Sequence, residues 1–123
     1  MLDKRNFYIN GKWAKPSKIN DFQIINPSNE DHVATISLGH ENDTNAAVKA
    51  AKDAFIKWKE TSKEERLILL ENLLKIYKNR FDEMSNAISM EMGAPIDWSS
   101  SAQTASGQSH LEDFILRTKK FNF

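Results

Sequence analysis

The spacing of apolar residues changes near Asn42, and this change divides the chain into a strand-forming first third and a helical remainder. Before Asn42, short runs of β-branched and aromatic residues are separated by turn residues, whereas after it apolar residues recur three and four positions apart. Alternation suits a half-buried strand, and the three-four spacing draws one stripe along a helix. The 123-residue sequence therefore predicts an α+β segment with β-hairpins in residues 1–40 and helices in residues 41–123.

Two hairpins are expected in the first third. Asn10-Gly11 separates the short apolar runs 7–9 and 12–14, and this dipeptide is typical of a type I′ turn between paired strands. A second pair, residues 22–25 and 33–38, flanks the turn-forming sequence Asn26-Pro27-Ser28-Asn29. The four strands are expected to form one meander or to extend another sheet.

Three helices are expected in the remainder. The first covers residues 42–60, where an apolar stripe runs from Ala47 to Trp58. The second begins at a capping box formed by Ser62 and Glu65 and ends near Met92, because Gly93 suits a helix end. Its stripe is wide enough to predict burial on more than one side.

The third helix is expected over residues 96–119. Its first half contains three consecutive serines, which are poor helix formers, and several small residues. Small residues permit close approach of another backbone or of a ligand, and tight packing is the more common reason for them.

Composition excludes several classes of function. The chain has 17 basic and 17 acidic residues and no net charge, so it lacks the long-range attraction that nucleic acid or an anionic membrane exerts on a basic protein. Its first residues contain no apolar signal-peptide core, which favours a cytoplasmic protein. The absence of cysteine excludes disulfides, thiolate metal sites and a cysteine nucleophile within this chain.

Phe7-Tyr8-Ile9-Asn10-Gly11-Lys12-Trp13 opens a series of short segments that, in this order, resembles the amino-terminal part of the aldehyde dehydrogenase superfamily. The resemblance begins with an "INGxW" hairpin and an "NP" turn, and Glu30 stands where the family usually has glycine-glutamate. It ends at a sequence similar to the family's "ETGKP" helix end. The matching segments are Phe7-Tyr8-Ile9-Asn10-Gly11-Lys12-Trp13, residues 22–29, 33–36, 46–58 and 65–70, and Met90-Glu91-Met92-Gly93-Ala94-Pro95.

The resemblance implies an α/β enzyme that oxidises an aldehyde to a carboxylate and passes hydride to NAD or NADP. In the family, the catalytic cysteine, the general-base glutamate, the oxyanion-stabilising groups and the Rossmann-type cofactor site all lie beyond the matched stretch. We therefore expect residues 1–123 to be the amino-terminal segment of such an enzyme, with its helices packed on the cofactor domain. No catalytic or cofactor-binding residue is expected within the chain, which is predicted to be inactive alone.

The same resemblance implies two peripheral sites. Family members often hold a monovalent cation with backbone carbonyls and one carboxylate, which here correspond to Ile24, Ile25 and Glu91. The third helix lies near the substrate entrance in the family, which places Ala102 and Ser106 beside the path of the aldehyde.

The three histidines are far apart in sequence, so zinc is not expected. The three tryptophans are expected to be core or interface anchors.

Two kinds of function remain open from the sequence. The first is a part of an enzyme, whose partners are the remainder of that enzyme or other subunits, with a homo-oligomer expected for the full-length protein. The second is a stand-alone helical interaction module that has lost the chemistry and binds a partner through its apolar helix. The sequence leaves the aldehyde and the choice between NAD and NADP open.

Overall fold

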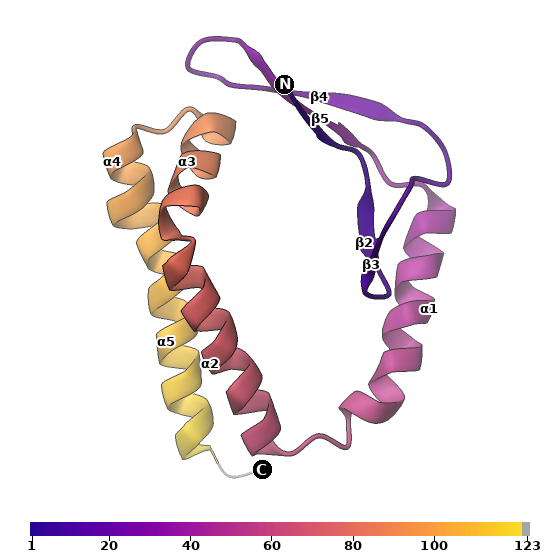
Figure 1. Ribbon diagram of the computed structural model, residues 1–123, viewed down its shortest axis with the longest axis vertical. Helices are drawn as coiled ribbons and strands as arrows, with labels where there is room; N and C mark the ends of the chain where they lie inside the picture. Colours follow the sequence, from indigo (N-terminus) through magenta and orange to yellow (C-terminus); the bar gives the residue numbers. More distant parts are fainter. Residues whose placement is uncertain (122–123) are drawn as a thin grey trace. The chain divides into compact units, whose positions relative to one another are not determined.

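A computed structural model describes residues 1–121 as two units, Met1–Glu60 and Thr61 onward (Figure 1). The first unit holds all the strands and one helix, and the second unit is entirely helical. The first helix therefore groups with the strands, although it lies beyond the predicted change of period.

The first unit contains a three-stranded mixed sheet with the strand order β1-β5-β4. β5 (His32–Ser37) is central, pairing parallel with β1 (Leu2–Lys4) and antiparallel with β4 (Asp21–Ile25). The predicted pair β4 and β5 is confirmed, with a register shift between Ile24 and Ile25. β1 was missed because three residues show no usable alternation, and a parallel partner far away in sequence leaves no local signal.

The predicted first hairpin is confirmed as β2 (Phe7–Ile9) and β3 (Lys12–Ala14), which form a separate two-stranded sheet. Of the two expected arrangements, a single meander of all four strands is wrong, because the strands form two sheets. Asn10 and Gly11 have φ values of 54° and 74°, the left-handed pair that a type I′ turn requires. Across this hairpin Tyr8 and Trp13 meet edge to face, with ring centroids 5.2 Å apart.

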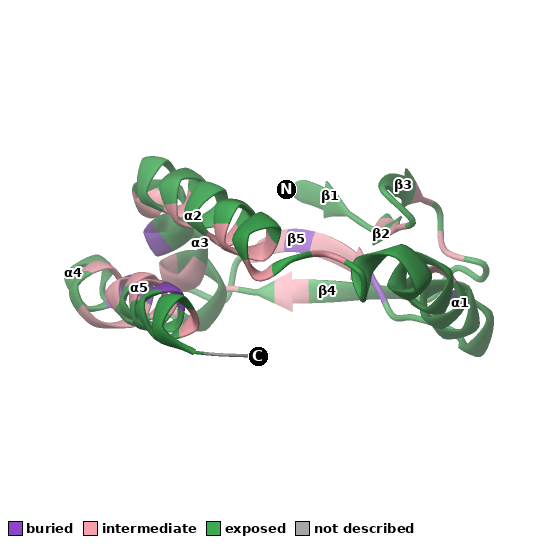
Figure 2. Ribbon diagram, turned by 90° about the horizontal axis from the view of Figure 1, so that it is seen from below, coloured by how far each residue is buried: buried purple, intermediate pink, exposed green. Residues whose placement is uncertain are grey.

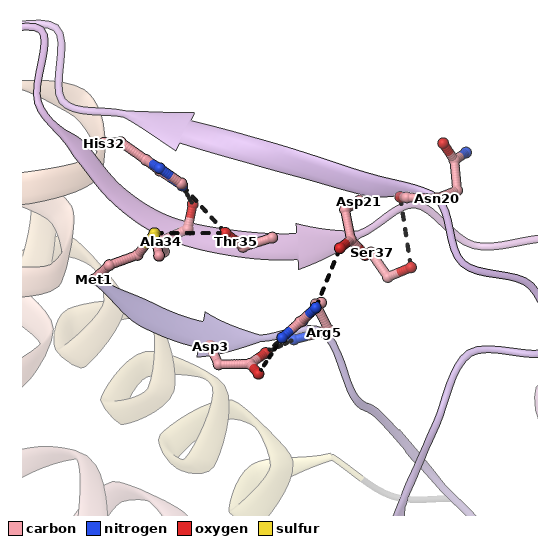
Figure 3. Close-up of polar contacts among 9 residues, drawn as sticks. All are labelled: Met1, Asp3, Arg5, Asn20, Asp21, His32, Ala34, Thr35 and Ser37. Carbon is pink, nitrogen blue, oxygen red and sulfur yellow. Dashed lines mark hydrogen bonds and ion pairs between the residues drawn. The ribbon is translucent and has the colours of Figure 1, made fainter.

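Arg5 links the two outer strands of the mixed sheet at one end (Figure 3). Its guanidinium donates to Asp3 at 2.7 Å and to Asp21 at 3.2 Å. The hydrogen bonds from Arg5 lower the pKa of Asp3 to about 2. These side chains are exposed, so the pairs fix local geometry more than they stabilise the fold.

Asp43 caps the start of α1 (Glu41–Trp58), which confirms the predicted first helix. Its carboxylate accepts the backbone N–H of His40 at 3.0 Å and that of Ser17 at 2.8 Å. It thereby ties the loop after β3 to the helix. Asp43 thus lies in the first turn of α1 and is buried.

We expect Asp43→Asn to destabilise the first unit near neutral pH and to do so less in acid. The two backbone hydrogen bonds lower the pKa of Asp43 below its ordinary value of 3.8. Because the folded pKa is depressed, the stabilisation is present above pH 3.8 and is lost as pH falls through the lower folded value. The unfolding temperatures of Asp43→Asn and of the parent chain should therefore approach each other as pH falls, and thermal unfolding at a series of pH values measures this. The exposed Asp53→Asn on the same helix is the control, and parallel curves for Asp43→Asn and the parent chain would contradict the expectation.

The second unit begins at the predicted capping box. Ser62 Oγ accepts the N–H of Glu65 at 3.1 Å, and the Glu65 carboxylate accepts the N–H of Ser62 at 2.7 Å. The single predicted helix is two helices, α2 (Lys63–Asn79) and α3 (Phe81–Met92), broken at Arg80 with φ −111° and ψ 21°. Periodicity did not reveal the break because the apolar stripe continues across it, with Tyr77 against Phe81.

The predicted end of this helical stretch is confirmed, because Gly93 adopts φ 69° after α3. The predicted third helix is also present, but in three parts. α4 (Ile96–Trp98) leads into a π-helical stretch, η1 (Ser99–Thr104), and α5 (Ala105–Lys120) follows. α5 packs against α2, and η1 packs against α3.

Neither unit buries much of its apolar surface (Figure 2). The described chain exposes 9468 Å², against roughly 8,000 Å² for two separate compact domains of half its mass. The prediction that the second helix is buried on more than one side is wrong for the described residues. Its first part, α2, packs mainly against α5, and its other faces are exposed. Its exposed side chains include Ile68, Leu69, Leu73 and Ile76. Trp13, Trp58 and Trp98 are also exposed, so none is a core anchor here.

Candidate functional site

The structure places the predicted peripheral site residues on four elements. Ile24 and Ile25 lie at the end of β4 in the first unit, at the register shift of that strand. Glu91 lies, exposed, in the last turn of α3 in the second unit. Ala102 is half-buried in η1, and Ser106 is exposed at the start of α5. The side chain of Ser106 donates to the carbonyl of Ala102 at 2.8 Å, so these two residues form one local structure.

The most buried side chains of the second unit are hydroxyls. Ser85, Ser99 and Thr104 are 2%, 0% and 0% exposed, and together we call them the hydroxyl network. Ser99 Oγ donates to the carbonyl of Ser85 at 2.7 Å, and Ser85 Oγ lies 3.0 Å from Thr104 Oγ1. Buried hydroxyls that all find partners fix one geometry, because each lost partner leaves a desolvated polar group.

Tyr77 extends this network to α2. Its hydroxyl donates to the carbonyl of Thr104, where η1 passes into α5, at 2.9 Å. Gly107, one turn further along α5, provides the room, because a Cβ there would collide with the Tyr77 hydroxyl and lie 3.0 Å from Cζ. The absent side chain of Gly107 thus allows α2 and α5 to approach closely.

Gln103 lies beside the network with an incomplete set of partners. Its amide nitrogen contacts the sulfur of Met92 at 3.8 Å. Its Oε1 is buried without a hydrogen-bond partner among the described residues. A buried acceptor without a donor is costly and uncommon in native structures.

Ion pairs line a shallow groove between α2 and α5. Lys78 meets Glu112 at 2.6 Å, and Lys119 meets Glu71 at 2.6 Å. Lys78 and Gln108 lower the pKa of Glu112 through hydrogen bonds. The groove also contains Leu74, Lys75 and Ile115. These pairs join the two helices, and their partial exposure keeps each contribution small.

Within residues 1–121, no three histidine or carboxylate side chains gather as a metal site would require. None of the helices in that range combines the length and the apolar character needed to cross a membrane.

The sequence analysis missed the hydroxyl network. The serines of residues 99–101 were read as poor helix formers, and Ser85 and Thr104 were not singled out. One signal in the sequence could have indicated the network: Ser99 and Thr104 are five residues apart, whereas residues on one face of a regular α-helix recur three and four apart. Spacing alone could not show which hydroxyl meets which backbone group, because the partners lie on another helix.

Comparison with known proteins gives the chain's relationships. The aldehyde dehydrogenase family matches residues 13–121. A 3-succinoylsemialdehyde-pyridine dehydrogenase from a Pseudomonas species is 45% identical over 96 residues, which cover 78% of this chain and 20% of that protein. A putative aldehyde dehydrogenase from Staphylococcus aureus is 34% identical over 111 residues, covering 90% of this chain and 23% of that protein.

Solved structures agree with these relationships. A Bartonella henselae aldehyde dehydrogenase superposes with a TM-score of 0.99 at 52% identity, covering 100% of this chain and 26% of that one. Aldehyde dehydrogenase C from Pseudomonas syringae, a mutant solved with NAD⁺ and octanal, gives a TM-score of 0.94 at 31% identity, covering 97% of this chain and 24% of that one.

The strands and helices of this chain are thus those of a segment of an α/β enzyme fold. The chain belongs to the aldehyde dehydrogenase family. It spans about a fifth to a quarter of the length of the relatives it matches.

Proposed function

We propose that this chain is the amino-terminal part of an NAD(P)-dependent aldehyde dehydrogenase that oxidises an aldehyde to a carboxylate. The observation that carries the proposal is the match of the whole chain, at a TM-score of 0.99, to 26% of a Bartonella aldehyde dehydrogenase. The Pseudomonas syringae structure contains NAD⁺ and octanal, which supports a nicotinamide cofactor and an aldehyde substrate for the complete enzyme. None of the comparisons supports the alternative of a stand-alone interaction module.

The chain's role in this proposal is structural. Its sequence contains no cysteine, so a cysteine nucleophile must come from elsewhere in the enzyme. The exposed apolar side chains of α2 provide surface that further polypeptide would cover, since contiguous apolar area seldom faces water in a complete protein. We therefore propose that the remainder of the enzyme packs on these helices and that the chain alone is inactive.

A chimera tests this function. The 123-residue chain replaces the matching segment of the Bartonella henselae enzyme, and NADH formation is measured with a series of aldehydes. We expect the chimera to oxidise aldehydes and the chain alone to form no NADH. A folded chimera without activity would contradict the proposal, and so would activity of the chain alone.

Ala102 and Ser106 are proposed to lie beside the path of the aldehyde in the complete enzyme. Ser106 is exposed in the second unit, which leaves its side chain able to contact a substrate. We expect Ser106→Trp in the chimera to raise the KM for octanal more than that for propanal, because a bulky side chain would narrow the path. Equal kinetics with both aldehydes would remove Ser106 from the substrate path.

The monovalent cation site at Ile24, Ile25 and Glu91 stays a prediction. The register shift between Ile24 and Ile25 supports it, because an irregular ladder frees backbone groups that a regular one would engage. If the site exists, exchanging sodium and potassium for tetramethylammonium at constant ionic strength lowers the unfolding temperature of the chimera, and Glu91→Gln removes that difference. Identical unfolding temperatures in all three salts would argue against the site.

We also propose that the complete enzyme is a cytoplasmic homo-oligomer. A single-subunit mass in sedimentation, or recovery of the enzyme from a membrane or secreted fraction, would contradict this.

A further inference from the structure

The π-helical stretch η1 allows two side chains, Ser99 and Thr104, to reach the same residue of α3. Ser99 and Thr104 are five residues apart, and at about 100° per residue a regular α-helix would place them about 140° apart. Both nevertheless meet Ser85, one at its carbonyl and the other at its hydroxyl. The wider turn of a π-helix, with its i→i+5 hydrogen bonds, adds a residue and brings both side chains to the same neighbour.

This wider turn also decides which residues face outward. On an uninterrupted α-helix Ser106, seven residues after Ser99, would share the face of Ser99 and point toward α3. In the structure Ser99, Thr104 and Ile115 are the buried residues between Ser99 and Lys120, while Ser106 is exposed. The hydroxyl network therefore determines that Ser106, together with the Ala102 carbonyl that it contacts, lies on the open side.

The arrangement has a cost. The stretch interrupts a regular helix, buries hydroxyls where apolar side chains would pack without hydrogen-bond constraints, and leaves Gln103 Oε1 buried without a partner among the described residues. π-Helical turns inside α-helices are rare and are frequent at functional sites. A costly turn of this kind points to a role for the position of the turn beyond stability.

We propose that Ser85 and Thr104 are positioning residues for the aldehyde, holding residues 99–104 in the π-helical geometry that leaves Ser106, at the start of α5, exposed toward the substrate. This inference rests on the proposed function. The two residues do not contact the aldehyde; they act through the turn, and they determine how the enzyme discriminates between long and short aldehydes.

Thr104→Val in the chimera tests the inference, because valine keeps the shape of threonine and removes its hydroxyl. We expect the KM for octanal to rise about fivefold, the effect of one lost hydrogen bond, with kcat and the KM for propanal and NAD⁺ unchanged. Thr118→Val is the matched control, since Thr118 lies near the end of α5 and its hydroxyl donates to the carbonyl of Phe114, within the same helix, at 2.7 Å. Thr104→Ser, which keeps the hydroxyl, should restore the octanal KM.

Hydrogen exchange of the same chimeras separates this inference from the proposed function, because it does not require activity. Thr104→Val should accelerate exchange in residues 99–106 and leave residues 111–120 unchanged, whereas Thr118→Val should leave residues 99–106 unchanged. An inactive parent chimera would overturn the proposed function, and with it the substrate role proposed here. In an active chimera, equal KM changes for both aldehydes, or altered exchange without any KM change, would overturn the positioning role.

Discussion

Replacing Gly107 by alanine is expected to destabilise the second unit by about 2 kcal/mol. The direction is opposite to helix propensity, because alanine is ordinarily better than glycine in a helix by about 1 kcal/mol. The reason is the close approach of Tyr77, whose hydroxyl occupies the space that the new Cβ would need. To admit the methyl group, Tyr77 must move and give up its hydrogen bond to the carbonyl of Thr104.

Urea unfolding of the chain, followed by circular dichroism, measures this effect, and a double-mutant cycle assigns its cause. Tyr77→Phe removes the colliding oxygen, so Gly107→Ala should cost less in that background than in the parent chain. Gly39→Ala is the control, because the nearest side-chain atom to a Cβ there is 4.0 Å away. A stabilising Gly107→Ala, or additive costs for the two substitutions, would show that α2 and α5 do not approach as described.

Replacing Ser99 by valine is expected to destabilise the second unit by about 3 kcal/mol. Ser99 is fully buried and donates to the carbonyl of Ser85 at 2.7 Å. Valine loses this hydrogen bond and adds a methyl group where the helices already touch. The cost is large because hydrogen bonding and packing are lost at the same place.

Ser101→Val provides a matched comparison within the same π-helical stretch. Ser101 is exposed and donates only to the carbonyl of Asp97, at 2.6 Å, so the same substitution should change stability by no more than about 0.5 kcal/mol. Urea unfolding of both variants under one set of conditions gives the difference. Similar costs at the two positions would mean that helix propensity, and not the hydroxyl network, determines the stability of this stretch.

Local chemistry allowed the sequence to predict several elements. Asn10-Gly11 predicted its turn because the left-handed backbone angles that it requires are a property of those two residues. Ser62 and Glu65 predicted a helix start because both groups of the capping box lie within one turn. Gly93 predicted a helix end because the left-handed backbone conformation that ends the helix is a property of glycine itself. The family could also be predicted, because the order of short motifs survives in the sequence.

Other features depend on partners that are distant in sequence. β1 exists because β5 is available to pair with it, and the π-helical turn exists because Ser99 and Thr104 both meet Ser85. The predicted cation and substrate-entrance residues come from the family resemblance, and the chain's own geometry adds the register shift at Ile24 and the exposure of Ser106.

The sequence by itself determined the first hairpin, the start of α2 and the end of α3, which family the chain resembles, and that no cysteine nucleophile lies within it. Turns, caps and periodicity involve residues a few positions apart, so the chain carries that information locally. The tertiary structure decided which faces are buried and how helix α5 is rotated. A buried hydroxyl needs a partner from another helix, and close approach needs a missing side chain such as that of Gly107. Both conditions are met only when the helices pack together.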